Sequence, residues 1–140
     1  YVRGPGVPTG RTVEHLAGLV DLVPTFLGLA GTPIPASVDG MSLAPLLTAT
    51  PPAITTWRQE MLIEHPAGAG TPIRIPPYYA VRTQTEMYVE YDNFENEYYD
   101  LRTDPAQLTN IARSAPSSTL ARLAARVAAL KACRGASCRP

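Results

Sequence analysis

The sequence predicts a small α+β unit, a roughly four-stranded antiparallel sheet covered by a C-terminal helix, which follows an incomplete α/β piece. Three observations support this fold class. Residues 86–91 alternate in side-chain character, and residues 79–83 and 97–101 are similar short runs on either side. Apolar residues recur at intervals of three and four over residues 120–130. Residues 1–50 show one short helical pattern and an otherwise irregular chain.

The runs between residues 79 and 101 predict a three-stranded meander. The polar stretch 92–96 predicts a hairpin loop, and residues 83–85 predict a short turn. The two sides of the central strand carry Met87, Val89 and Tyr91 on one side and Glu86, Tyr88 and Glu90 on the other. We expect one solvated face and one face covered by the C-terminal helix. The apolar positions of that helix are Leu120, Leu123, Ala124, Val127 and Leu130.

Residues 60–65 predict the fourth strand. Its centre is the continuous apolar run Met61, Leu62 and Ile63, which indicates burial on both faces. The following loop, residues 66–77, is long and rich in glycine and proline. Loops of this length in compact domains are often functional.

In the first half, Asp21 is suited to cap a short helix. Leu22, Phe26 and Leu29 form a stripe at helical spacing that has to be buried against something, and Gly31 stands where a helix would end. Residues 48–54 predict a linker and a subdomain boundary. Further on, Asp104-Pro105-Ala106-Gln107 matches a capping box and predicts a second short helix, which would end near residue 112.

The composition excludes several classes of protein. A chain of 140 residues suffices for one ordinary domain, and its net charge of zero gives no indication of nucleic-acid or membrane-surface binding. The chain has no apolar run of the roughly 20 residues that span a bilayer. It begins without an initiator methionine or signal peptide, which suggests a fragment or a processed piece.

The two cysteines, Cys133 and Cys138, lie five residues apart near the C-terminus, with Gly135 between them. The glycine permits the tight turn that a small disulfide loop requires, and a disulfide would imply an exported protein. Two free surface thiols are the alternative.

The best local candidate for a site is Glu64-His65, at the end of the predicted fourth strand and the start of the long loop. A histidine there could donate a hydrogen bond or transfer a proton. The structural alternative is a histidine bonded to a loop carbonyl beside a glutamate paired with an arginine.

His15 and His65 are too far apart in sequence to indicate a metal site. The cluster Tyr88, Glu90, Asp92, Glu95 and Glu97 could bind a cation or a sugar ring, but a solvated hairpin face is the more ordinary interpretation.

Four segments, in order, resemble the C-terminal part of the formylglycine-dependent sulfatases, members of the alkaline phosphatase superfamily, and are closest in character to arylsulfatases and N-acetylglucosamine-6-sulfatases. The segments are residues 1–7 (YVRGPGV), 20–31 (VDLVPTFLGLAG), 39–47 (DGMSLAPLL) and 98–112 (YYDLRTDPAQLTNIA). Gln107 replaces the glutamate that many members carry. Each segment alone is moderately specific, whereas the ordered set covers nearly the whole chain.

The resemblance implies an enzyme, a sulfuric ester hydrolase, whose parent fold is α/β. Residues 1–50 would be the tail of the catalytic domain and residues 51–140 the C-terminal subdomain. The parent would use calcium and formylglycine, but the family's catalytic and metal-binding residues lie N-terminal to this region. We therefore expect no catalytic residue, metal ligand or cofactor in this segment, and an isolated chain without activity.

The resemblance also implies a location and partners. The location would be secreted or periplasmic. The partners would be the rest of the catalytic domain and a sulfated small molecule or sugar, with Glu64 and His65 at the rim of the substrate pocket. The alternatives are a related phosphate or phosphonate ester hydrolase and a non-catalytic binding module.

Overall fold

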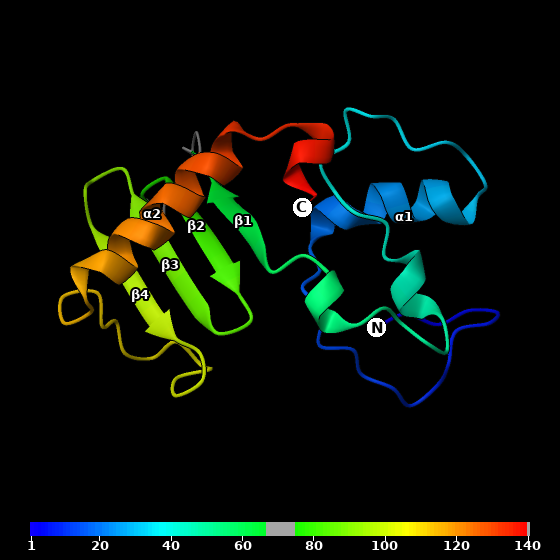
Figure 1. Ribbon diagram of the computed structural model, residues 1–140, viewed down its shortest axis with the longest axis horizontal. Coiled ribbons are helices and arrows are strands. Elements are labelled where there is room, and N and C mark those ends of the chain that lie inside the picture. Colours follow the sequence, from blue (N-terminus) through cyan, green and yellow to red (C-terminus); the bar gives the residue numbers. More distant parts are fainter. Residues whose placement is uncertain (67–74, 140) are drawn as a thin grey trace. The chain divides into compact units, whose positions relative to one another are not determined.

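A computed structural model describes residues 1–66 and 75–139, which form two compact units (Figure 1). Unit 1 comprises Tyr1–Gln59 together with Cys133–Pro140, and unit 2 comprises Glu60–Ala132. The chain therefore leaves unit 1 once and returns to it. The domain boundary expected after residue 50 concerns the parent enzyme and stays a prediction.

Unit 2 is built on a four-stranded antiparallel sheet with the strand order β1-β2-β3-β4 (Figure 1). The strands are β1 (Glu60–His65), β2 (Tyr78–Thr83), β3 (Glu86–Tyr91) and β4 (Asn96–Asp100). The turn between β2 and β3 is closed by Thr83, whose hydroxyl oxygen accepts a bond from the Glu86 N–H at 2.9 Å. The predicted meander and its fourth strand are confirmed. Because β1 is an edge strand and Met61, Leu62 and Ile63 are only half-buried in this chain, the expected burial of that run on both faces is not observed.

Helix α2 (Ser117–Ala132) crosses one face of the sheet, as predicted (Figure 1). Its buried positions Leu123, Val127 and Leu130 pack in one cluster with Val81, Tyr88 and Tyr98 of the sheet. Full burial of a leucine or valine contributes about 1.5–3 kcal/mol each, so this contact is the main source of stability in unit 2. The C-terminal helix of the predicted fold class is thus confirmed.

The helix-covered face carries Tyr88 and Glu90, two members of the cluster that was interpreted as a solvated hairpin face. Tyr88 is only 2% exposed, and it shares the helix-covered face with Glu86 and Glu90. The interpretation of Tyr88 and Glu90 as part of a solvated hairpin face was therefore wrong. The physical reason is that the Tyr88 hydroxyl donates to Glu90 at 3.1 Å, so the aromatic ring is buried without stranding its polar end.

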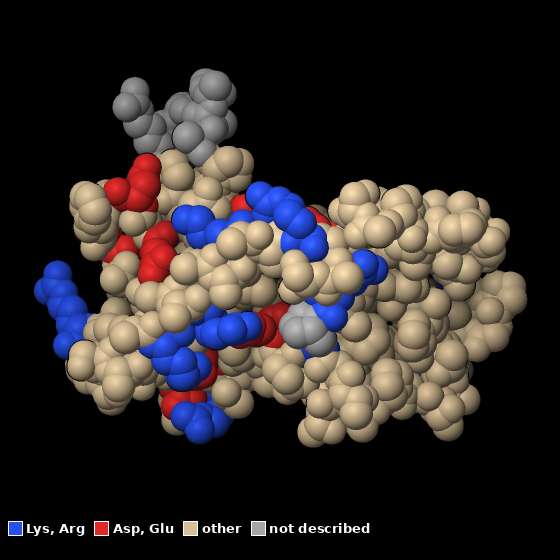
Figure 2. Space-filling view, turned by 45° about the horizontal axis from the view of Figure 1, so that its top comes forward, with Lys and Arg blue, Asp and Glu red and all other residues tan. Residues whose placement is uncertain are grey.

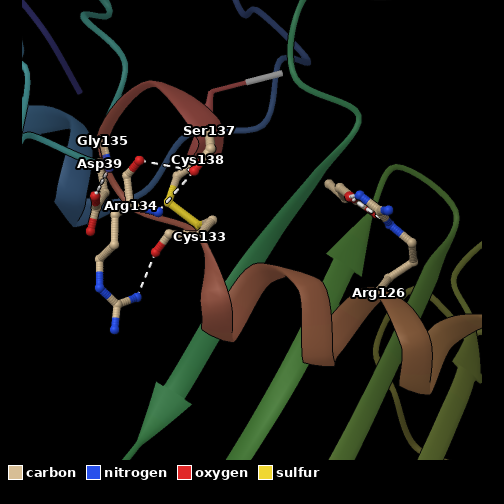
Figure 3. Close-up of a disulfide and its surroundings, with 8 residues drawn as sticks. Asp39, Arg126, Cys133, Arg134, Gly135, Ser137 and Cys138 are labelled. Atoms are coloured by element: carbon tan, nitrogen blue, oxygen red, sulfur yellow. Dashed lines mark hydrogen bonds and ion pairs between the residues drawn. A yellow bond between two sulfur atoms is a disulfide. The ribbon is translucent and has the colours of Figure 1, made fainter.

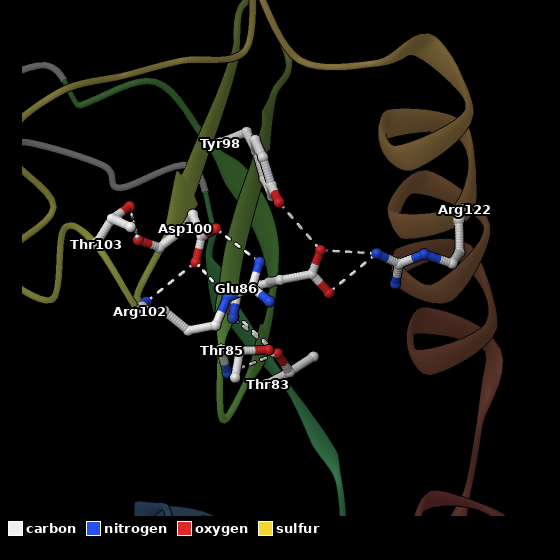
Figure 4. Close-up of polar contacts among 8 residues, drawn as sticks. All are labelled: Thr83, Thr85, Glu86, Tyr98, Asp100, Arg102, Thr103 and Arg122. Carbon is white, nitrogen blue, oxygen red and sulfur yellow. Dashed lines mark hydrogen bonds and ion pairs between the residues drawn. The ribbon is translucent and has the colours of Figure 1, made fainter.

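Glutamates at the margin of the covered face pair with the helix. Arg122 donates to both carboxylate oxygens of Glu86 at 2.7 and 2.9 Å, and the Tyr98 hydroxyl donates to the same carboxylate (Figure 4). Arg126 pairs with Glu60 in the same way. These pairs lie at the edge of the apolar contact and hold α2 in register over the strands.

The short helix predicted from Asp104 to residue 112 is absent, and turns occupy this stretch. The Asp104 carboxylate accepts bonds from the N–H groups of Leu108 and Thr109 at 3.0 and 2.9 Å, further along the chain than a helix cap would reach. Gln107 has a φ of 56°, in the left-handed region, which is incompatible with a continuing helix. The aspartate thus closes a loop, and the donors of that loop lower its pKa.

Unit 1 contains helix α1 (Leu22–Leu29) and short 3₁₀ turns. The predicted apolar stripe is present but uncovered: Leu22, Phe26 and Leu29 are 39, 62 and 63% exposed. Asp21 stands at the N-cap position but makes no capping bond. Its carboxylate instead accepts from the N–H groups of Gly18 and Met41, both at 2.8 Å, and contacts Arg58 Nη2 at 2.5 Å.

The Asp39–Leu43 segment, one of the four that carry the resemblance, is held against α1 by backbone donors. Met41 donates to Asp21, and the Leu43 N–H donates to the Thr25 hydroxyl at 2.7 Å. A Cβ on Gly40 would lie 2.1 Å from the Val20 carbonyl oxygen, so only glycine fits there. The residues of this motif therefore hold this loop close to the start of α1.

Cys133 and Cys138 are joined by a disulfide, which closes a 3₁₀ turn over Gly135–Cys138 (Figure 3). The Gly135 N–H donates to the Asp39 carboxylate. Gly135 has a φ of 56°, and a Cβ there would lie 2.2 Å from the Ala36 carbonyl oxygen. The disulfide turn is therefore fitted to the loop before Gly40, which explains why these last residues belong to unit 1.

Within the described ranges, no helix is long and apolar enough to cross a membrane. In the view of Figure 2, acidic and basic side chains intermingle over the sheet and α2, whereas the visible surface of unit 1 carries few charges.

Candidate functional site

A row of three aromatic side chains crosses the sheet on the face opposite α2, and we call it the aromatic row. It consists of His65, Tyr78 and Tyr91, which are direct cross-strand neighbours on β1, β2 and β3. The His65 and Tyr78 rings are stacked with centroids 5.4 Å apart, and Tyr78 meets Tyr91 edge-on at 5.5 Å. Cross-strand aromatic pairs each contribute about 0.2–1 kcal/mol, so the row also ties three strands together.

A shared carboxylate continues this row onto β4. Glu97 accepts hydrogen bonds from the Tyr91 hydroxyl at 3.2 Å and from the Tyr99 hydroxyl at 3.0 Å, one on each oxygen. Burial, followed by the neighbouring Glu97 charge, raises the pKa of Tyr91 and raises that of Tyr99 to about 12. Both phenols therefore stay protonated at neutral pH and act as donors to Glu97.

The structure separates the two predicted site residues. Successive side chains of a strand point to opposite faces, so Glu64 lies on the helix-covered side and His65 on the other. Glu64 is exposed and sits opposite Tyr79, whereas His65 is half-buried in the aromatic row. The two residues do not form one site. Most of the loop that follows, residues 67–74, lies outside the described residues.

Sequence reasoning missed the partners of His65. Tyr78 and Tyr91 join it only through strand register, which single-strand patterns do not fix. One feature of the sequence could have predicted this pairing. Tyr78 begins β2 and Tyr91 ends β3, so the short turn between the two strands places them opposite each other.

A shallow open concavity of about 470 Å³ adjoins the end of the row. Its walls include Tyr91, Phe94 and Glu97 from the hairpin and Asn110 and Arg113 from the loop beyond β4. Phe94 is 95% exposed and has a φ of 66°, an uncommon conformation for an aromatic residue. The region thus offers ring edges, hydroxyls, a carboxylate and a guanidinium to a ligand or a neighbouring domain.

Among the residues that the structure describes, no three His, Cys, Asp or Glu side chains gather to hold a metal ion. The described side chains therefore do not fit the calcium ion that the sequence resemblance implies for the parent. His15, the second histidine, bonds the Pro52 carbonyl at 3.0 Å through Nε2 and packs edge-on against Trp57, which makes it part of the unit 1 core.

Comparisons with known proteins agree over most of the chain. Residues 2–132 match the family described as "N-sulphoglucosamine sulphohydrolase, C-terminal". The chain is 32% identical to human N-acetylglucosamine-6-sulfatase over 169 aligned positions, covering 99% of this chain and 30% of that protein. It is 33% identical to arylsulfatase K of Rattus norvegicus, covering 84% of this chain and 22% of that protein. The chain thus spans less than a third of the length of either relative.

Two solved structures share the fold of most of this chain. A structure titled BT4656 in complex with its substrate D-glucosamine-2-N,6-O-disulfate superposes with a TM-score of 0.65 and 27% identity, covering 77% of this chain and 22% of that one. The phosphonate monoester hydrolase SpPMH from Silicibacter pomeroyi superposes with a TM-score of 0.71 and 27% identity, covering 90% of this chain and 27% of that one.

Proposed function

This chain belongs to the sulfatases, in whose family it corresponds to the C-terminal region, and we propose that it is part of an enzyme that hydrolyses sulfate monoesters to an alcohol and sulfate. The observation that carries the proposal is the continuous family match over residues 2–132, joined to a superposable fold. Two of the four segments that carry the resemblance contact each other in unit 1, through the bond from Met41 to Asp21 and the close approach of Gly40 to Val20. We propose that the region is the structural partner of a catalytic part.

We propose that the catalytic part supplies the nucleophile, formylglycine, and the calcium ion. This assignment rests on the family, whose C-terminal model matches residues 2–132. The 140-residue chain is therefore expected to show no hydrolysis of a chromogenic aryl sulfate in the presence of calcium. The longest reading frame that encodes residues 1–140 should hydrolyse it, once matured to carry formylglycine. Turnover by the short chain that disappears on unfolding would contradict the division of roles.

A phosphonate or phosphate ester hydrolase is the second candidate, because SpPMH superposes over nine-tenths of the chain. The same long reading frame separates the two when it is assayed with an aryl sulfate and an aryl phosphonate of equal leaving group. A preference of about tenfold or more in kcat/KM for the phosphonate, equivalent to about 1.4 kcal/mol in transition-state binding, would favour this second candidate.

For the substrate, we propose a sulfated sugar, with His65 at the rim of its pocket. Support comes from the half-buried aromatic row, whose polar edges suit a hydroxylated ring, and from the neighbour that was solved with a glucosamine disulfate. Glu64 lies on the other face, so the proposal no longer includes it. Contact with the alcohol portion of the ester would place His65 outside the bond-breaking machinery.

The His65→Ala variant should then lose activity in a substrate-dependent manner. With a small aryl sulfate the loss should be slight, whereas a sulfated sugar should lose about 0.5–1.5 kcal/mol of binding, mainly through KM. Glu64→Ala is the matched control, and its activity on both substrates should equal that of the unmodified enzyme. A fall in kcat of about 100-fold or more on every substrate would instead identify His65 as a general acid or base. No change on either substrate would leave it a structural residue of the row.

We propose that the enzyme is exported, either secreted or periplasmic. The disulfide between Cys133 and Cys138 supports export, because such bonds persist in oxidising compartments. Mass spectrometry of the protein from its native compartment should find the two residues bonded. Two free thiols there would contradict both the bond and the inferred location.

A further inference from the structure

The concavity at the end of the aromatic row has a lining that suits a sugar ring, and we call it the hairpin concavity. Its volume is about 470 Å³, and its walls come from the hairpin between β3 and β4, the loop beyond β4 and Leu120 of α2. Ligand sites in proteins commonly measure roughly 300–1,000 Å³. We propose that the hairpin concavity binds an unsulfated pyranose ring, which stacks on Phe94. The inference goes beyond the proposed function, because binding at this place does not involve hydrolysis.

Phe94 occupies a position in the hairpin that the backbone reserves for a different kind of residue. The Tyr91 N–H donates to the Glu95 carbonyl at 3.0 Å, and the Phe94 N–H donates to the Tyr91 carbonyl at 3.2 Å, so residues 92–94 form the loop. The last position of such a loop is left-handed, and glycine suits it best. Phe94 has a φ of 66° there, and its side chain is 95% exposed. The hairpin alone therefore gives no reason for an aromatic ring at this position.

The wall formed by the loop beyond β4 is fixed by the side chain of Asn110. Its Oδ1 accepts from the N–H groups of Tyr98 and Ala112 at 3.1 and 2.9 Å. Its Nδ2 donates to the Asn96 carbonyl at 3.1 Å. Both ends of the amide are thus engaged in holding the loop against β4. A wall that is already ordered lowers the conformational cost of binding a ligand.

Polar groups suited to sugar hydroxyls stand around the Phe94 ring. The lining includes the carboxylates of Glu95 and Glu97 and the guanidinium of Arg113. Each Glu97 oxygen accepts a tyrosine hydroxyl, whereas Glu95 and Arg113 are exposed. Within the described residues Arg113 forms no ion pair, unlike the arginines of α2. An acceptor and a donor are therefore available for the hydroxyls of a ring whose apolar face lies on Phe94.

The charges of the lining favour an unsulfated ring over a sulfated one. Two carboxylates and one guanidinium leave a net negative charge, which repels a sulfate ester. Glu95 and Glu97 belong to the cluster for which the sequence allowed a sugar ring as ligand. Tyr88 and Glu90 of that cluster are excluded from the site, because they lie on the helix-covered face. The sulfated unit that is hydrolysed would therefore bind elsewhere.

Direct binding measurements test the proposal without any reference to catalysis. The protein encoded by the longest reading frame that contains residues 1–140 is titrated with methyl glucoside and with its 6-sulfate, and binding is followed by saturation-transfer NMR. Phe94→Ala should weaken the binding of methyl glucoside about tenfold or more, whereas Phe94→Trp should keep it within about threefold. Leu108→Ala is the matched control, since Leu108 is 84% exposed in the loop beyond β4 and does not line the concavity.

Three results of this titration would overturn the proposal. The first is the absence of methyl glucoside binding by the unmodified protein. The second is equal binding by the Phe94→Ala and Leu108→Ala variants. The third is a Phe94-dependent affinity that is higher for the 6-sulfate than for the neutral glycoside, because the lining charges predict the opposite order.

Phe94→Gly separates a role in binding from a role in packing. Glycine adopts the left-handed conformation without steric cost, so the melting temperature of this variant should equal or exceed that of the unmodified protein. Its binding of methyl glucoside should nevertheless be lost together with the ring. A melting temperature lowered by several degrees would show that the ring is packed against another part of the protein, and the sugar site would then be wrong.

Discussion

At the scale of single residues, the side chain of Asp21 connects three separate segments of unit 1. It is fully buried, and its carboxylate joins the turn at Gly18, the segment at Met41 and the guanidinium of Arg58. Arg58 Nη2 lies 2.5 Å from Asp21 Oδ1, and both side chains are almost fully buried, so the two form a buried ion pair. Such a pair is costly to bury and more costly to break.

Asp21→Ala should therefore lower the free energy of unfolding by about 3–5 kcal/mol, because it leaves the Arg58 charge buried without a partner. Denaturant unfolding of the long protein, followed by amide exchange at Met41 and Thr25, measures the effect in unit 1. Asp100→Ala is the control: it removes the exposed pair with Arg102 and should change stability little. Similar losses for both variants would show that Asp21 has no special role.

At the scale of secondary-structure elements, periodicity predicted the strands and the long helix well. Alternation located β2, β3 and β4, and the three-four spacing located α2, because both elements bury a regular stripe. The short helix predicted from the capping pattern at Asp104 was wrong, because an aspartate that can cap a helix can equally close a loop. The solvated-face interpretation of Tyr88 and Glu90 was wrong, because the tyrosine hydroxyl donates to Glu90 at the edge of the core and its ring can be buried.

The candidate site was less predictable than the fold. His65 was found because it ends a strand, but its neighbours depend on register between strands, which the sequence determines only when turns and cores are known together. Glu64 was coupled to His65 by adjacency in sequence, and the two-residue repeat of a strand puts adjacent residues on opposite faces.

The tyrosine-glutamate pairs of the sheet predict a loss of stability at alkaline pH. Burial, then the charge and hydrogen bond of Glu90, raises the pKa of Tyr88 from 10.0 to about 12, and the pKa of Tyr99 reaches about 12 in a similar way. Because the folded-state pKa lies above the unfolded value, the folded state favours the neutral phenol. This stabilisation is fully present below pH 10.0 and is lost as pH rises through about 12.

We therefore expect the melting temperature to decrease as the pH is raised from 10 to 12. The Tyr99→Phe variant should show a smaller decrease, because it lacks one titrating group. Thermal melts across this range, together with the near-ultraviolet phenolate signal, measure both effects. Native tyrosines that all ionise near the ordinary value of 10.0 would be incompatible with the Glu90 and Glu97 contacts.

At the scale of the whole molecule, the two units differ in how completely they bury their apolar residues. Unit 2 has a helix-covered core with Val81, Leu123 and Val127 fully buried. Unit 1 buries fewer apolar residues, among them Leu16, Leu46 and Trp57, and leaves Phe26 and Leu29 of α1 exposed. The two units should accordingly differ in local stability.

Amide exchange in the 140-residue chain should therefore be fast before Pro51 and slow from residue 79 to residue 101. The strand amides exchange only when the core cluster around Leu123 opens, whereas opening of α1 exposes less apolar surface, because Phe26 and Leu29 are already exposed. Exchange monitored by mass spectrometry distinguishes the two segments. Equal protection in both would show that unit 1 has a complete core of its own.

The return of the chain to unit 1 at Cys133 has a consequence for the order in which the protein is made. During synthesis, Asp39 emerges long before Gly135, the donor that it accepts from 96 residues later. Strands and α2 can assemble on the ribosome from an uninterrupted stretch of nascent chain, because unit 2 is contiguous. Unit 1 cannot be completed until residues 133–138 have been translated, because the Asp39 carboxylate lacks the Gly135 N–H donor until then. A stop after residue 132 and before residue 138 would therefore release a chain with a complete unit 2 and an incomplete unit 1.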